Sequence, residues 1–253
     1  MTMISSAVRL LAAAAISVCA FSSQASVTFT VDETPYGGGL VDAQRINGGY
    51  TEVITFDGAG GFTTAAAATF SQFFNIGNPN VVPAQIGTGY SLYAIFTASG
   101  SVVPLGGGLT SFVGTGGSFT LYLDAARDTV LNLGATGSDP VTRSGGLLDD
   151  LELASADSLS GGTGVLVPNI GGFFDLTFND FALTTDGQNY FIAPNPFSIY
   201  VNVDGDFDNF LAAGTQRIDG DVSAQFLVPE PGSLALAGLA LLGLGVTSRR
   251  RKA

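Results

Sequence analysis

Apolar and polar residues alternate in short segments through the middle of the chain, between residues 26 and 228. Alternation of this kind places successive side chains on opposite faces of a half-buried β-strand. The segments with this pattern are 27–31, 50–56, 90–96, 117–123, 148–153, 173–183, 197–203 and 221–228. Because no long helical period appears among them, we expect an all-β fold.

Glycine pairs and triplets separate or interrupt these segments. They lie at 37–39, 48–49, 60–61, 106–108, 116–117, 145–146, 161–162 and 171–172. Glycine adopts the positive φ angles that hairpin turns require, so we expect turns at these positions. Short strands with such frequent turns are typical of a β-sandwich or a jelly roll.

Other segments are less regular. Residues 65–74 open with four alanines and fit either one short helix or a strand. Residues 79–83, 138–144 and 193–196 contain proline, serine or asparagine and are predicted to be loops.

The first residues have the pattern of a secretory signal peptide. Arg9 precedes an apolar run over residues 10–20, and small residues follow up to Ala25. A basic flank, an apolar core and a small-residue site predict a signal helix that enters the Sec translocon and is cut after Ala25. A lipoprotein site at Cys19 is the alternative, but Val18 stands where a small residue is expected.

The last residues have the pattern of a membrane anchor. Residues 234–246 are apolar and uncharged, and as a helix they would measure about 20 Å, marginal for a bilayer of about 30 Å. A basic stop follows, formed by Arg249, Arg250, Arg251 and Lys252. Basic residues favour the cytoplasmic side, so we expect one transmembrane helix in the inner membrane with the rest of the chain outside.

Three parts follow from these patterns. Residues 1–25 are the predicted signal peptide, 26–227 one exported all-β domain, and 228–253 the C-terminal tail. The middle part is long enough to bury a core of its own.

Composition excludes several kinds of chemistry. The chain has no histidine and no tryptophan, and Cys19, its single cysteine, lies in the predicted signal peptide. A Ser-His-Asp triad, histidine metal ligands and thiol catalysis are therefore excluded from the exported domain. Residues 26–230 hold four arginines against 21 acidic residues, a formal charge of −17. Such a domain repels nucleic acid.

The densest acidic motif is a candidate calcium site. Asp204, Asp206 and Asp208 are spaced by two residues, so in a strand their carboxylates share one face. Carboxylate oxygens are calcium ligands. An EF-hand loop starting at Asp204 would need glycine and glutamate where Asn209 and Thr215 stand. The alternative is a solvated loop after the strand at 197–203.

A second acidic group, Asp149, Asp150 and Glu152, raises the question of catalysis. Two carboxylates can hydrolyse a glycoside when burial keeps one of them neutral. Nothing in the sequence fixes such a pair in a cleft, and we expect no enzyme activity.

The tail resembles the PEP-CTERM sorting signal. The motif is Val228, Pro229, Glu230 and Pro231, followed by a short Leu/Gly/Ala helix and the basic stop. The resemblance implies that a membrane enzyme, exosortase, removes the tail during export to the surface of a Gram-negative bacterium that makes exopolysaccharide.

The exported domain resembles the flocculation-associated PEP-CTERM proteins. The similarity lies in short, strand-like motifs of low specificity, at 29–32, 46–56, 92–96, 121–124 and 213–216. It implies a role in floc or biofilm formation with exopolysaccharide, and it supplies no catalytic residues. Alternatives are a carbohydrate-binding β-sandwich module, with or without calcium, and an enzyme acting on glycosides.

Overall fold

The computed structural model describes residues 24–197 and 200–229, and most of these residues lie in β-strands, with almost no helix. The strands are β1 (Gln24–Ser26), β2 (Phe29–Asp32), β3 (Leu40–Ala43), β4 (Arg45–Phe56), β5 (Gly61–Phe74), β6 (Val81–Val82), β7 (Ser91–Gly106), β8 (Leu109–Asp124), β9 (Val130–Asn132), β10 (Thr142–Ser144), β11 (Asp150–Ala156), β12 (Ser158–Val167), β13 (Gly171–Asn179), β14 (Ala182–Leu183), β15 (Phe191–Ala193), β16 (Tyr200–Phe207) and β17 (Thr215–Pro229). A 3₁₀ turn, η1 (Thr34–Tyr36), and one short helix, α2 (Thr185–Tyr190), accompany them.

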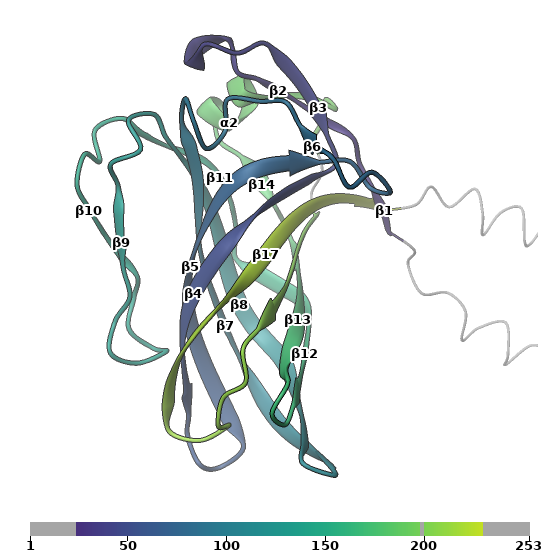
Figure 1. The fold of residues 1–253 in the computed structure, drawn as a ribbon, viewed down its shortest axis with the longest axis vertical. Helices are drawn as coiled ribbons and strands as arrows, with labels where there is room; N and C mark the ends of the chain where they lie inside the picture. Colours follow the sequence, from purple (N-terminus) through teal and green to yellow (C-terminus); the bar gives the residue numbers. More distant parts are fainter. Residues whose placement is uncertain (1–23, 198–199, 230–253) are drawn as a thin grey trace, which may run out of the picture. The chain divides into compact units, whose positions relative to one another are not determined.

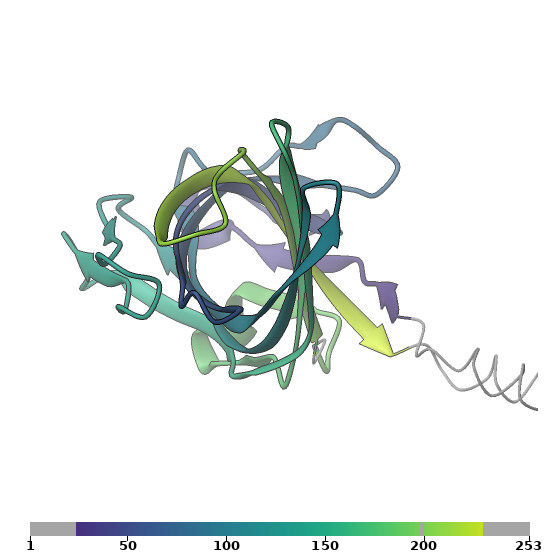
Figure 2. The ribbon, with the colours of Figure 1, turned by 90° about the horizontal axis from the view of Figure 1, so that it is seen from below.

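The long strands form a closed, eight-stranded barrel (Figures 1 and 2). Its order is β4-β5-β7-β8-β12-β13-β16-β17, all neighbours are antiparallel, and β17 pairs with β4 to close the ring. Each barrel strand therefore pairs with the barrel strands before and after it in the sequence. Closure leaves the long strands without a free edge.

This closure corrects the expected architecture, although the all-β class is confirmed. The chain forms one ring rather than the two stacked sheets of a sandwich or the double sheet of a jelly roll. Sandwiches and barrels both bury one face of each strand, so they share the same alternation. The pairing of β12 with β8 and of β17 with β4 decides between them.

Several glycine pairs predicted as turns lie inside strands instead. Gly48 and Gly49 lie in β4, Gly116 and Gly117 in β8, and residues 161–162 in β12. A Cβ atom at Gly48 would collide with the backbone carbonyl of Thr69, and β4 has a register shift at this point. These glycines permit the close strand approach and bulges of a coiled barrel. The turns at 37–39, 60–61, 106–108 and 145–146 are confirmed.

Small side chains on β5 face the barrel interior. The segment 65–74 is part of this strand, so the helical alternative is wrong. Ala66, Ala68 and Phe70 are fully buried.

A small sheet, β15-β2-β3, covers the end of the barrel at the top of Figure 1, together with α2. The ring of Phe29 makes edge contacts with those of Phe73, Phe191 and Phe226 at centroid distances of 5.2–5.9 Å. These rings form an apolar plug beneath the small sheet.

A hairpin, β9–β10, lies outside the barrel wall on the left of Figure 1. The predicted loop 138–144 therefore contains a strand, as does 79–83, where β6 pairs with β5. The predicted loop at 193–196 starts at the last residue of β15. The peptide bonds before Pro194 and Pro196 are cis.

The predicted terminal segments fall mostly outside the described residues. The signal helix lies there, and the predicted cut after Ala25 falls in β1. The membrane helix at 234–246 lies there too. Within residues 24–197 and 200–229, no helix is long and apolar enough to cross a membrane.

Candidate functional site

The barrel interior contains a carboxyl group. In β4 the even-numbered residues face inward, so Tyr50, Glu52 and Ile54 project into the lumen. Glu52 is only 9% exposed. A charged residue thus occupies a position that the alternation reserves for an apolar side chain.

Glu52 lines a cavity of about 50 Å³, together with Phe62 near the start of β5 and Phe207 at the end of β16. The start of β5 lies at the barrel end drawn at the bottom of Figure 1. Thr64 lines the cavity from β5, Gly114 lines it from β8, and Gly162, Thr163 and Gly164 line it from β12. The apolar lining residues are Ile54, Phe62, Phe96, Ala98, Phe112, Phe174, Leu176, Phe207 and Phe210. The cavity is therefore an aromatic chamber whose described lining includes one carboxyl group, that of Glu52.

Burial controls the protonation of Glu52. It raises the pKa of this carboxyl from 4.5 to about 7, and a hydrogen bond with the Thr64 side chain opposes the rise. Among the described residues that line the cavity, Glu52 is the only ionisable one, and no arginine or lysine faces it there. The described lining therefore supplies no positive charge to the carboxylate form.

Tyr50 lies beside this chamber. Its ring contacts those of Phe174 and Phe96 at centroid distances of 5.3 and 6.0 Å. Its hydroxyl is buried and makes no hydrogen bond within the described residues. Burial and the neighbouring Glu52 raise the pKa of the Tyr50 hydroxyl, so it stays neutral.

The loop between β16 and β17, residues 208–214, contributes one wall of the cavity. Phe210 projects from this loop against Phe56, Phe112 and Phe207, at ring-centroid distances of 5.4–6.2 Å. Two hydrogen bonds hold the loop: Asn169 N–H donates to Asn209 Oδ1 at 2.9 Å, and Phe56 N–H donates to the Gly214 carbonyl at 2.8 Å. Phe210 is thus an aromatic lining residue that comes from a loop rather than from a strand.

The predicted calcium residues lie on the outer side of β16. Asp204 is half-buried and accepts from Gln225 Nε2 at 3.3 Å, and burial raises its pKa. Asp206 accepts from the backbone N–H of Asp221 at 2.9 Å, while Asp208 is exposed beyond the strand end. The structure does not bring the three carboxylates together as one ligand group.

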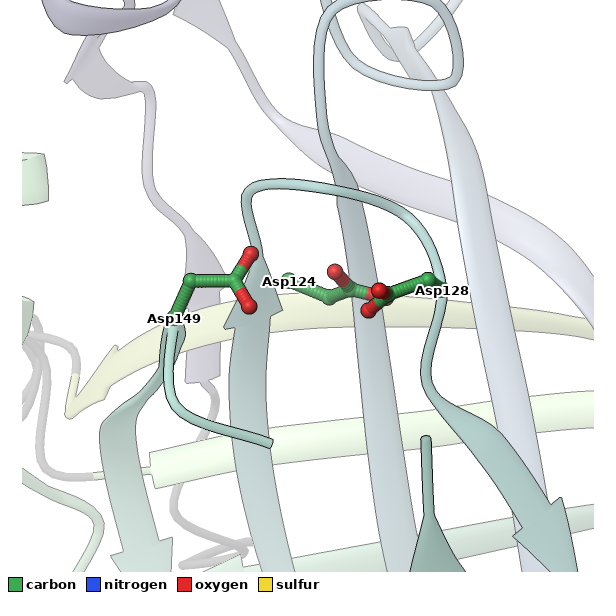
Figure 3. Close-up of side chains that lie close together, drawn as sticks. All are labelled: Asp124, Asp128 and Asp149. Atoms are coloured by element: carbon green, nitrogen blue, oxygen red, sulfur yellow. The ribbon is translucent and has the colours of Figure 1, made fainter. Parts of the chain in front are cut away.

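A different set of carboxylates converges, as Figure 3 shows. Oxygen atoms of Asp124, Asp128 and Asp149 lie within 4.8 Å of one another. The register that pairs Asp150 of β11 with Asp124 of β8 brings the two chain segments side by side. Asp124 is buried and accepts from two backbone N–H groups, those of Arg127 and Thr129, at 2.6 and 3.0 Å.

Hydrogen bonds and an ion pair hold the carboxyl group of Asp150 in place. It accepts from Tyr93 Oη at 2.6 Å and from Thr129 Oγ1 at 2.8 Å, and it pairs with Arg143 at 3.6 Å. The Arg143 guanidinium also lies 4.2 Å from the centre of the Tyr122 ring. These contacts hold the β9–β10 hairpin to the barrel wall. The group considered for glycoside hydrolysis is therefore divided between this network, Asp149 and an exposed Glu152.

The residue missed in the sequence is Glu52. Its signal was present: Tyr50, Glu52, Ile54 and Phe56 share one parity in an alternating strand. A carboxyl on the apolar face of a strand is a candidate buried functional group.

Of the sorting motif, Val228 and Pro229 end β17, and Glu230 and Pro231 lie outside the described residues, as does the basic stop. The family model described as the PEP-CTERM protein-sorting motif matches residues 227–252. A search of curated proteins found no match, and a search of solved structures found none. The resemblance of the barrel domain to flocculation-associated proteins thus has no support from a relative. The tail marks the chain as an exosortase substrate exported to the cell surface of a Gram-negative bacterium.

Proposed function

We propose that this chain is a non-enzymatic protein of the cell surface or extracellular matrix that promotes floc or biofilm formation together with exopolysaccharide. The observation that supports the proposal is the sorting motif at residues 227–252, because a protein exported to the cell surface can meet secreted polymer there. Export begins at the Sec translocon, and exosortase then removes the inner-membrane anchor.

The outer face of the barrel supports contact with a polar polymer. A shallow depression between β13, β16 and β17 is lined by Asp206, Asp208, Asp219 and Asp221. The Phe173 ring, 56% exposed, lies beside them. Exposed carboxylates on many copies of the domain would bind divalent cations, and calcium would bridge them to acidic groups of the polysaccharide.

An enzyme acting on glycosides is the less favoured function. Such a mechanism requires two carboxyl groups across a cleft with different pKa values. Glu52 has a raised pKa, but its cavity offers no second carboxyl group among the described lining residues.

A carbohydrate-binding module is the second candidate. Exposed tyrosines around a concavity would favour it, because sugar rings stack on aromatic faces. All seven tyrosines of the chain lie in the described part, and none is classed as exposed. The acidic surface therefore supports polymer bridging better than a sugar-stacking cleft.

Deletion of residues 26–227, with the signal peptide and tail retained, tests the proposal. We expect the cells to stay dispersed while secreting a normal amount of polysaccharide, and the intact gene to restore settling. Normal settling of the deletion strain would contradict the proposed function. A calcium chelator should disperse flocs of the intact strain, and flocs that resist it would contradict the bridging role of calcium.

A further inference from the structure

The chamber inside the barrel goes beyond the proposed surface role, because its chemistry suits a small molecule rather than a polymer. We propose that the lumen binds the cationic head of a small apolar amine, with Glu52 as its counter-charge and phenylalanine rings as its walls.

Charge is the first part of the argument. A buried carboxylate is stable only when hydrogen bonds or an opposite charge replace the water it has lost. The Thr64 hydroxyl, the one side-chain group that lowers the pKa of Glu52, also donates a hydrogen bond to the Val53 carbonyl at 3.1 Å, and no basic side chain lines the chamber within the described residues. An ammonium group on a ligand supplies the missing charge. An anionic ligand would add a second negative charge and is excluded by the same reasoning.

The walls are the second part. Phe62, Phe96, Phe112, Phe174 and Phe207 come from five different strands and line the same cavity as Glu52. The negative face of an aromatic ring attracts a cation, and the attraction grows when the cation is removed from water. The walls also favour the apolar part of the ligand. A neutral alcohol gains only that apolar contact.

Size is the third part. The volume of about 50 Å³ is roughly a third of a cavity of about 150 Å³ that holds benzene. An ammonium group with its first carbons fits, whereas a longer alkyl chain must pass the loop that carries Phe210. Eight-stranded barrels leave an interior that side chains fill or that holds one small ligand. This barrel combines both cases, because phenylalanine rings fill most of the interior around the cavity and leave room for a small group.

The experiment uses three probes of one shape: butylamine, butanol and butyrate. Each is titrated by calorimetry into the exported protein, purified from expressing cells, at pH 8. We expect butylamine to bind at least tenfold more tightly than butanol, and butyrate to show no binding. Equal affinities for the amine and the alcohol, or no heat from any probe, would overturn the proposal.

Variants identify the site. Glu52→Gln keeps the size of the side chain and removes its charge, so we expect at least a tenfold loss of butylamine affinity and little change for butanol. Glu152→Gln makes the same substitution on the exposed face of β11 and should leave both affinities unchanged. Glu52→Asp retains the charge and should retain part of the preference for the amine. If Glu52→Gln binds butylamine as well as the unaltered protein does, the amine does not bind at Glu52, and the inference is wrong.

Phe210→Ala tests the entrance. We expect it to admit benzylamine, whose ring is too large for the chamber of the unaltered protein, with a gain in affinity of several fold. Circular dichroism confirms that each variant is folded before it is titrated. An unchanged affinity for benzylamine would show that Phe210 does not limit access.

Discussion

Two buried glutamates lie at opposite ends of the barrel, and they differ in the partners that surround them. Glu33, 1% exposed, lies under the covering sheet and accepts three hydrogen bonds: from Gln85 N–H at 2.7 Å, Ile86 N–H at 3.1 Å and Tyr90 Oη at 2.7 Å. Glu52, 9% exposed, lies among phenylalanine rings with Thr64 as its side-chain partner. Burial alone therefore does not define the role of a carboxyl group. The satisfied one fixes structure, and the unsatisfied one is available to a ligand.

The largest expected effect is at Glu33. Glu33→Ala removes the acceptor of three hydrogen bonds, two of them buried and one partly buried, and we expect a loss of roughly 4 kcal/mol in the free energy of unfolding. Urea denaturation of the exported protein measures it. Glu152→Ala, on an exposed residue, should change the free energy by less than about 0.5 kcal/mol. Similar small losses in both variants would contradict a structural role for Glu33.

Glu52 should behave in the opposite way. Because the pKa of Glu52 is about 7 in the folded state and near 4.5 when unfolded, the folded protein binds the extra proton between those values. Stability therefore falls as pH rises from about 4.5 to 7, and the loss is complete above pH 7. Glu52→Gln should remove this loss and stabilise the protein by roughly 3 kcal/mol at pH 8. At pH 4 the gain should vanish.

Urea denaturation at several pH values checks this second prediction. Glu152→Gln serves as the control, since its carboxyl group is exposed. A stability gain for Glu52→Gln that is equal at pH 4 and pH 8 would show that the charge of Glu52 is not its source.

Phe210 should contribute less than either glutamate. Its ring is partly exposed and packs on Phe56, Phe112 and Phe207 from a loop. Phe210→Ala should cost roughly 1 kcal/mol, because the side chain is only partly removed from water. Faster hydrogen exchange should be confined to residues near 208–214. Loss of protection throughout the barrel would contradict the view of Phe210 as a local wall.

The smallest expected effect is that of calcium on thermal stability, which distinguishes the cluster of Asp124, Asp128 and Asp149 from the aspartates of β16. Among the acidic residues that the structure describes, the oxygens of Asp124, Asp128 and Asp149 converge, so added calcium should raise the thermal midpoint through them, by a degree or two. Asp128→Asn should abolish this shift, and Asp206→Asn should leave it unchanged. Thermal scans with calcium and with a chelator measure it. The reverse pattern would restore the calcium site predicted at Asp204, Asp206 and Asp208.

Much of the strand content could be predicted because alternation is local. Segments 50–56 and 117–123 lie within strands, and all of 90–96 except its first residue lies in β7. Closure could not be predicted, because the pairing of β17 with β4 joins residues more than 150 positions apart, such as Arg217 and Val53. The glycines of β4 and β8 look like turn residues until the neighbouring strand is known.

The sites follow the same division. Asp204, Asp206 and Asp208 are close in sequence, but their carboxylates do not share partners: Asp204 accepts from Gln225 and Asp206 from the backbone of Asp221. Asp124 and Asp149 are distant in sequence and meet only through the register of β8 and β11. Glu52 could have been identified from its parity in β4, whereas the rings around it come from strands throughout the chain.

The most direct test is a pH titration of the Glu52 side-chain carboxyl by ¹³C NMR, with and without butylamine. We predict a midpoint near pH 7 for the free protein, set by burial. Butylamine should lower that midpoint, because a bound cation favours the carboxylate. A midpoint near 4.5, or one that butylamine does not move, would contradict a ligand site at Glu52.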